Sequence, residues 1–163
     1  MSTAPREITT PKQLRDLLGI DWTHSKEQFA VITAPLEPGV VIAGAGSGKT
    51  SVMAARVVWL VATGRVDPAQ ILGLTFTTKA TAELQQRIRD SLRQAGLLPD
   101  RALRPPEADE TKELEEVEEP TVSTYHSYAS GLLSEHGLRA TVRLTRGQDI
   151  DAACGQLAAK AAA

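Results

Sequence analysis

The sequence contains little cysteine and few aromatic residues. Its 163 residues include a single cysteine, Cys154, and aromatic residues make up 4% of the chain. A lone cysteine allows no internal disulfide and has no companions for a metal cluster. No apolar run approaches the roughly 20 residues that span a membrane, and no basic and apolar leader opens the chain. We therefore expect a cytoplasmic protein with no membrane partner.

Charge of one sign is concentrated in a single segment. The chain has a formal net charge of −2, yet Glu107–Glu119 contains eight acidic residues and one lysine. The remainder of the chain is therefore net positive, which permits a polyanionic partner without requiring one. Because such charge density cannot bury a core, we interpret residues 99–120, which also contain four prolines, as an acidic surface loop.

The stretch most informative about function runs from Val40 to Thr50 and reads VVIAGAGSGKT. The run Val40–Ala43 predicts a strand, and a glycine-rich turn and then a helical pattern follow it, an order typical of a phosphate-binding loop. We expect three glycines to adopt positive φ there and to turn backbone N–H groups toward an anion. Lys49 would reach the β- and γ-phosphates, and the Thr50 hydroxyl would ligate Mg²⁺. The candidate phosphate-binding residues are Ala43, Gly44, Ala45, Gly46, Ser47, Gly48, Lys49, Thr50 and Ser51, of which Gly44, Gly46 and Gly48 are the three glycines, and Lys49 and Thr50 are the candidates for a direct part in catalysis.

A glutamine precedes this loop at a suggestive distance. Gln28 lies 21 residues before Lys49, on a helix that we predict within Asp21–Ala34 and that Thr23 or Ser25 could cap. Its amide both donates and accepts hydrogen bonds, which suits the N6/N7 edge of adenine. Alone the residue means little, but before a phosphate loop it suggests an adenine reader. His24, in the same stretch, has no second ligand at a suitable spacing, and we expect it to be a surface or capping residue.

Two further apolar runs predict strands at Ile71–Phe76 and Thr121–Thr124. Because helical patterns alternate with the predicted strands, the sequence indicates an α/β domain with a parallel sheet. Open sheets of this class bind ligands at the carboxyl ends of their strands. An exposed Phe76 could stack a nucleic-acid base there, but it could equally be a buried residue that ends a core strand. Tyr125, after the other strand, could likewise belong to a simple strand-to-helix turn.

Taken together, these residues resemble the amino-terminal half of the first motor domain of superfamily 1A DNA helicases, the UvrD/Rep/PcrA group. The matching segments are EQFAVI, AGAGSGKT, LTFTTKATAELQQRI and VSTYHSYA, which lie in the family's order between Trp22 and Leu138. The resemblance implies a P-loop NTPase (RecA-like) α/β fold, incomplete here, with ATP and Mg²⁺ as cofactors and single-stranded DNA as partner. It also implies that Gln28 reads adenine. The residues that it implies for DNA contact are Phe76, Thr77, Tyr125 and His126.

Within this group the chain resembles in particular the actinobacterial AdnA/AdnB-type helicase–nuclease subunits, which would imply a nuclease-bearing partner subunit. We divide the chain into an N-terminal extension (1–20), the N-terminal portion of a helicase ATP-binding domain (21–138) and a truncated or disordered tail (139–163). The family's D-E-x-Q motif has no match, because Asp109-Glu110 follows prolines and not a hydrophobic strand. We therefore interpret the chain as a fragment of an ATP-dependent 3′–5′ DNA helicase, inactive alone. A small P-loop kinase or GTPase and a non-catalytic nucleotide- or DNA-binding module are the alternatives.

Overall fold

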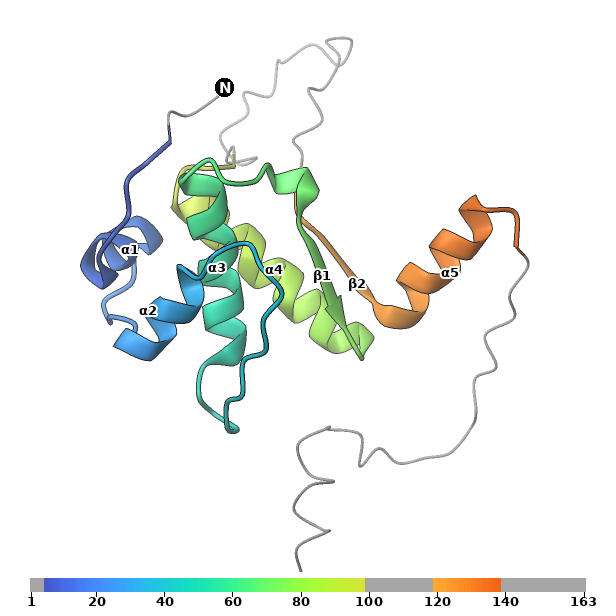
Figure 1. The fold of residues 1–163 in the computed structure, drawn as a ribbon, viewed down its shortest axis with the longest axis horizontal. Helices are drawn as coiled ribbons and strands as arrows, with labels where there is room; N and C mark the ends of the chain where they lie inside the picture. Colours follow the sequence, from blue (N-terminus) through green and yellow to red (C-terminus); the bar gives the residue numbers. More distant parts are fainter. Residues whose placement is uncertain (1–4, 99–118, 139–163) are drawn as a thin grey trace, which may run out of the picture. The chain divides into compact units, whose positions relative to one another are not determined.

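The computed structural model describes residues 5–98 and 119–138 as an α/β structure. Contacts divide the chain into two compact units, Met1–Tyr125 and His126–Ala163. All elements but one lie in the first unit, and helix α5 begins on its last residue. In chain order the elements are α1 (Pro11–Leu18), α2 (Lys26–Ile32), α3 (Lys49–Ala62), the 3₁₀ turn η1 (Pro68–Gln70), β1 (Leu72–Thr75), α4 (Thr78–Gln94), β2 (Thr121–Thr124) and α5 (Tyr125–Glu135) (Figure 1).

The two strands of the first unit form a parallel pair, as the alternation of strands and helices predicted. β1 and β2 run in register from Leu72 opposite Thr121 to Thr75 opposite Thr124. Helix α4 lies in the connection between them and packs against both strands. Its i, i+4 apolar stripe of Leu84, Ile88 and Leu92 is buried, so the connection covers the sheet as a parallel crossover must.

The prediction of a strand at Val40–Ala43 is wrong. These residues belong to no strand, and the exposed fractions of Val40, Val41 and Ile42 are 89%, 59% and 95%. β-branched residues favour an extended backbone, but a strand also needs a neighbour to accept and donate ladder hydrogen bonds. The described residues provide no such neighbour, because their sheet consists of β1 and β2 only.

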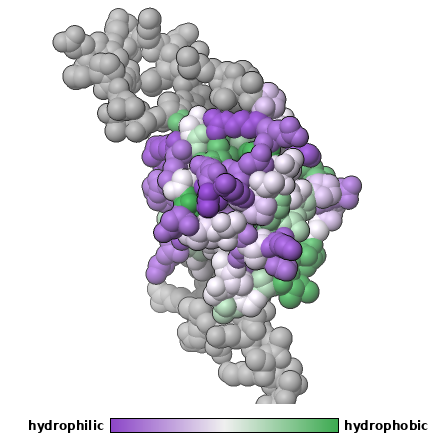
Figure 2. Space-filling view, turned by 90° about the vertical axis from the view of Figure 1, so that its left-hand side faces the viewer, coloured by the Kyte–Doolittle hydropathy of each residue, from purple (hydrophilic) through white to green (hydrophobic). Residues whose placement is uncertain are grey.

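Helix α3 is the centre of the core. It packs against α1, α2 and α4, which surround it in Figure 1. Trp59 is buried within α3, and its ring N–H donates to the Ile8 carbonyl at 3.1 Å, which ties the N-terminal segment to the helix. The side carrying α1 and α2 is mainly hydrophilic, with an apolar area toward the lower right of Figure 2. The buried residues of α3 are Val52, Ala54, Ala55, Val57, Val58, Trp59, Leu60 and Ala62.

Two residues at the end of the predicted acidic loop belong to the folded unit. Glu119 is half-buried and accepts two hydrogen bonds from Arg89 of α4, at 2.9 Å from Nε and 2.6 Å from Nη2. Pro120 is buried immediately before β2. The rest of that loop, Asp109-Glu110, Cys154 and the predicted tail 139–163 lie outside the described residues. Within the described part, no helix is both long and apolar enough to cross a membrane.

Candidate nucleotide-binding site

The glycine-rich loop leads directly into the buried helix α3 and is exposed throughout. Gly46 and Gly48 have φ of 75° and 80°, in the left-handed region, and Gly48 is the N-cap of α3. Gly44 does not adopt a positive φ, so the prediction of positive φ at all three glycines is wrong for Gly44. Of the three, Gly46 and Gly48 adopt it. The first N–H groups of a helix have no acceptor within the helix and carry the positive end of its dipole. The start of α3 therefore offers backbone donors to an anion.

Lys49 extends along this loop. Its Nζ donates to the carbonyl oxygens of Ala43 at 3.2 Å and Gly44 at 2.5 Å, and the Ser47 hydroxyl donates to the Gly44 carbonyl at 2.8 Å. The ammonium is thus already directed into the loop by neutral acceptors, which an anion would have to replace. Thr50 is exposed on the first turn of α3, next to Lys49. Its role toward Mg²⁺ and the role of Lys49 toward phosphates stay predictions.

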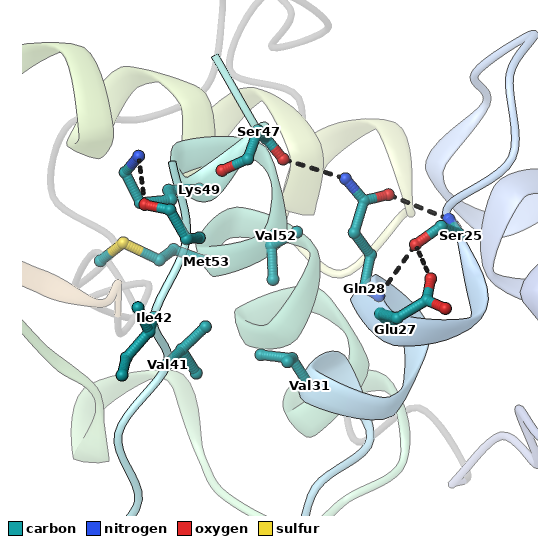
Figure 3. A pocket seen from close by; sticks show the side chains of 11 residues that line it. Ser25, Glu27, Gln28, Val31, Val41, Ile42, Ser47, Lys49, Val52 and Met53 are labelled. Carbon is teal, nitrogen blue, oxygen red and sulfur yellow. Dashed lines mark hydrogen bonds between the residues drawn. The ribbon is translucent and has the colours of Figure 1, made fainter. Parts of the chain in front are cut away.

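Gln28 lies against the same loop, although 19 residues separate it from Ser47. Of the two residues predicted as possible caps, Ser25 is the N-cap of α2, and its Oγ accepts from the Gln28 backbone N–H at 3.2 Å. The Gln28 side chain in turn bonds to Ser25, because its Oε1 accepts from the Ser25 backbone N–H at 2.9 Å. Its Nε2 donates to the Ser47 carbonyl at 3.1 Å (Figure 3). The amide keeps one N–H and one acceptor lone pair for a further partner.

A cavity of about 440 Å³ lies between α2, residues 41–43 and the start of α3. Its size falls in the range of small-molecule sites, roughly 300–1,000 Å³. Lys49 lies on one side of it, and Glu27 and Gln28 lie on the other (Figure 3). The Ser25 hydroxyl, which donates to Glu27 at 2.7 Å, and then the Glu27 backbone lower the pKa of the Glu27 carboxyl. The negative carboxylate of Glu27 would repel phosphates on its own side of the cavity, whereas the positive Lys49 on the opposite side would attract them. Apolar walls come from Val31, Val41, Ile42, Val52 and Met53.

Arg56 holds α2 against α3, a role that sequence reasoning missed. Its Nη1 lies 3.0 Å from the carbonyl oxygens of both Val31 and Ile32. The same nitrogen lies 2.9 Å from the Ala34 carbonyl, and Nη2 lies 3.1 Å from that of Pro35. Partial burial lowers the pKa of Arg56, although an arginine stays charged in proteins. Since all four acceptors are backbone carbonyls, no side-chain pattern in the sequence indicates this contact.

The two aromatic residues predicted at the strand ends do meet. Phe76 follows β1 and Tyr125 follows β2, and their ring centroids lie 5.0 Å apart with 36° between the ring planes. Phe76 is 69% exposed and Tyr125 is 47% exposed, so the interpretation of Phe76 as a buried end of a core strand is wrong. Thr77 is the N-cap of α4 and accepts from the Ala80 N–H at 3.1 Å. His126 is exposed on the first turn of α5, which lies in the second unit.

His24 is neither a surface residue nor the helix cap. It is 3% exposed, its ring lies 4.6 Å from the Trp22 ring, and neither ring nitrogen has a partner among the described residues. Burial lowers the pKa of His24. The signal missed in the sequence is its place one residue before the Ser25 N-cap of α2. Across the described residues no group of three metal-ligating side chains occurs.

These features define an α/β unit with an exposed glycine-rich loop at the start of its central helix. Lys49 extends along that loop, and Gln28 of α2 is hydrogen-bonded to it. The family model of the UvrD/REP helicase N-terminal domain matches residues 24–159, and the chain belongs to this family. The resemblance inferred from the four motifs is therefore confirmed.

Curated relatives are DNA helicases by name. A probable DNA helicase of Mycoplasma pneumoniae is 35% identical over 113 residues, which cover 69% of this chain and 18% of the relative. The ATP-dependent DNA helicase UvrD1 of Mycobacterium leprae is 51% identical over 69 residues, or 42% of this chain and 9% of the relative. DNA helicase IV of Escherichia coli is 57% identical over 53 residues, or 32% of this chain and 8% of the relative. The chain thus spans less than a fifth of these relatives.

Proposed function

We propose that this chain is the nucleotide-binding and single-stranded-DNA-binding amino-terminal part of an ATP-dependent DNA helicase with a RecA-like P-loop fold. The observation that carries the proposal is the exposed loop at the start of α3, into which Lys49 projects and against which Gln28 is hydrogen-bonded. A glycine-rich turn that binds no ligand would not require a hydrogen bond from a glutamine side chain 19 positions earlier in the chain. Family membership supports the same activity.

The donor groups present fit a Mg²⁺-bound nucleoside triphosphate. The N–H groups of the loop and of the first turn of α3, together with Lys49, would hold the phosphates. The Thr50 hydroxyl would hold Mg²⁺, and the free amide groups of Gln28 would meet the base. Bound Mg²⁺ neutralises charge that develops on the phosphoryl group. The family's acidic motif has no match in the sequence, so we propose that the chain alone binds ATP weakly and hydrolyses it negligibly.

The exposed aromatic pair supports a single-stranded partner. Phe76 and Tyr125 present two rings at the carboxyl ends of neighbouring strands, and aromatic faces stack bases without regard to sequence. Thr77 and His126 follow them in the chain and would add contacts to the strand. In Figure 1 the loop before α3 and the carboxyl ends of β1 and β2 lie toward the same end of the unit, which would let nucleotide and DNA act on one region.

The finer parts of the proposal follow the family resemblance. The whole protein would couple ATP hydrolysis to 3′–5′ translocation along single-stranded DNA, in repair or recombination, in the cytoplasm. A nuclease-bearing partner subunit would join it if it belongs to the AdnA/AdnB-type subunits. Because the chain spans less than a fifth of its curated relatives, these activities concern a protein larger than this chain.

Substitution of Lys49 by alanine tests the nucleotide site. Lys49→Ala removes the charge that faces the phosphates and should abolish binding of a fluorescent ATP analogue with Mg²⁺, measured by titration. Lys12→Ala, an equal charge change on the exposed face of α1, is the control and should bind as the unvaried chain does. An unvaried chain that retains no nucleotide would disprove the proposal. Hydrolysis at about 1–100 s⁻¹ would instead show that a catalytic carboxylate is present.

A further inference from the structure

We propose that Arg56 is a positioning residue for recognition of the nucleotide base, because it fixes helix α2 so that Gln28 stays at the phosphate loop. The inference rests on the proposed function and extends it to a residue that touches no part of the nucleotide. Arg56 lies seven positions after Lys49 on α3, about 10 Å along the helix axis at 1.5 Å per residue. The helix that begins at the loop thus also carries the group that holds α2.

The contacts of Arg56 are concentrated where α2 ends. Val31 and Ile32 belong to its last turn, whose carbonyl groups have no donors within the helix, although the Val31 carbonyl also accepts from the Ala34 N–H at 3.4 Å. Ala34 and Pro35 begin the segment that leads on to the glycine-rich loop. One planar guanidinium serves all four carbonyls, at 2.9 to 3.1 Å. A rigid fork of donors sets a direction as well as a distance, which a lysine cannot do.

Helix α2 needs such support. It has seven residues, and isolated helices shorter than about 12–15 residues are marginal in water. Phe29, Val31 and Ile32 pack against the core, but only Ile32 of these three is fully buried. Two polar contacts add to this packing, the bond from Gln28 to the Ser47 carbonyl near the start of α2 and the bonds from Arg56 at its end. Because the fully buried side chain is the last residue of the helix, this packing resists a tilt of α2 only weakly. The two polar contacts, one at each end, prevent the tilt.

A tilt of α2 would affect the base and the phosphates differently. Hydrogen bonds of the Gln28 amide require heavy-atom distances of about 2.7–3.2 Å, so a displacement near 1 Å removes them. The phosphate-binding groups belong to the loop and to α3, and α3 is held by its own buried residues. Loss of Arg56 should therefore weaken discrimination between bases and leave the affinity for phosphates nearly unchanged.

The test measures dissociation constants for ATP, GTP and inorganic tripolyphosphate, each with Mg²⁺, by titration calorimetry on the full chain. Arg56→Met removes the donors and keeps most of the side-chain length, and Arg56→Lys restores the charge with fewer directed donors. Arg87→Met, the same substitution at an exposed arginine of α4, is the matched control. Circular dichroism at the titration temperature establishes that each variant is folded.

We expect Arg56→Met to weaken ATP binding about tenfold and to abolish the preference over GTP, with less than a twofold change for tripolyphosphate. Arg56→Lys should recover part of the preference. Gln28→Ala should produce the same loss, and the double variant should lose little more, because both changes remove one recognition event. Equal weakening for ATP and tripolyphosphate, or additive losses in the double variant, would reduce Arg56 to a purely structural role and overturn the inference. An unvaried chain that binds none of the three ligands would overturn the proposed function with it.

Discussion

The exposed pair of Phe76 and Tyr125 offers the sharpest test of DNA binding. We predict that Phe76→Ala weakens binding of single-stranded DNA and leaves the fold almost unchanged. Phe76 is 69% exposed, so its truncation should alter the free energy of unfolding by no more than about 0.5 kcal/mol. A base stacked on an aromatic side chain contributes about 1–3 kcal/mol. The dissociation constant should therefore rise about 5- to 150-fold.

Fluorescence anisotropy of labelled oligonucleotides measures this change. Single strands of different sequence should lose affinity alike, and binding should weaken as salt rises, because phosphate contacts release counterions. Trp22→Ala is the control, since Trp22 is also an exposed aromatic residue, at 44%, but does not lie at a strand end. Phe76→Tyr should retain binding, because the ring remains. Unchanged affinity in Phe76→Ala, or an equal affinity of the chain for duplex and single strand, would refute the stacking argument.

Two predictions concern stability. Burial lowers the pKa of His24 below its ordinary value near 6.5, so the unfolded chain binds more protons below that pH and the free energy of unfolding should fall as pH drops from 7.5 to 5. His24→Gln should flatten this dependence in denaturant titrations, whereas a similar slope in His24→Gln and in the exposed-site control His136→Gln would contradict it. Gly46→Ala places a side chain at a φ of 75° and should cost about 1–2 kcal/mol in thermal unfolding. Gly44→Ala, without positive φ and with open space around it, should cost less than about 0.5 kcal/mol, and equal costs would show that the loop adjusts.

The features that the sequence predicted well are those governed by local chemistry. The sequence offered Ser25 as one of two possible caps of α2, and Ser25 is the N-cap; the capping box that it forms with Gln28, which we did not predict, depends on neighbouring residues alone. The parallel pair β1 and β2 follows from the apolar run Ile71–Phe76 and the mainly β-branched run Thr121–Thr124, with an amphipathic helix, α4, between them. Each of these elements is encoded by its own short residue pattern, so its type is predictable, and the parallel pairing then follows from the order of the elements along the chain.

The features that the sequence did not predict depend on distant partners. Val40–Ala43 has the composition of a strand, but whether it pairs depends on a neighbour elsewhere in the fold. Arg56 stands in an apolar helical run that indicates burial, and its acceptors are backbone carbonyls that leave no trace in side-chain pattern. His24 is polar, and only the packed structure places both its ring nitrogens away from partners. Side-chain periodicity reports which face is buried and not which group lies opposite.

The bond from Gln28 to the Ser47 carbonyl joins the proposed base reader to the proposed phosphate-binding loop at a single peptide unit. That carbonyl and the Gly48 N–H share one planar trans peptide, in which C=O and N–H point in opposite directions. Gln28 donates to the carbonyl side of this peptide at 3.1 Å, so the Gly48 N–H points away from the glutamine. A carbonyl oxygen is a weaker partner for the Lys49 ammonium than a phosphate oxygen, since the carbonyl is a neutral dipole and the phosphate carries a charge of opposite sign. In the proposed site, exchange of the Ala43 and Gly44 carbonyls for phosphate would therefore be favoured at the ammonium, and the Gly48 N–H lies on the side of its peptide away from the glutamine.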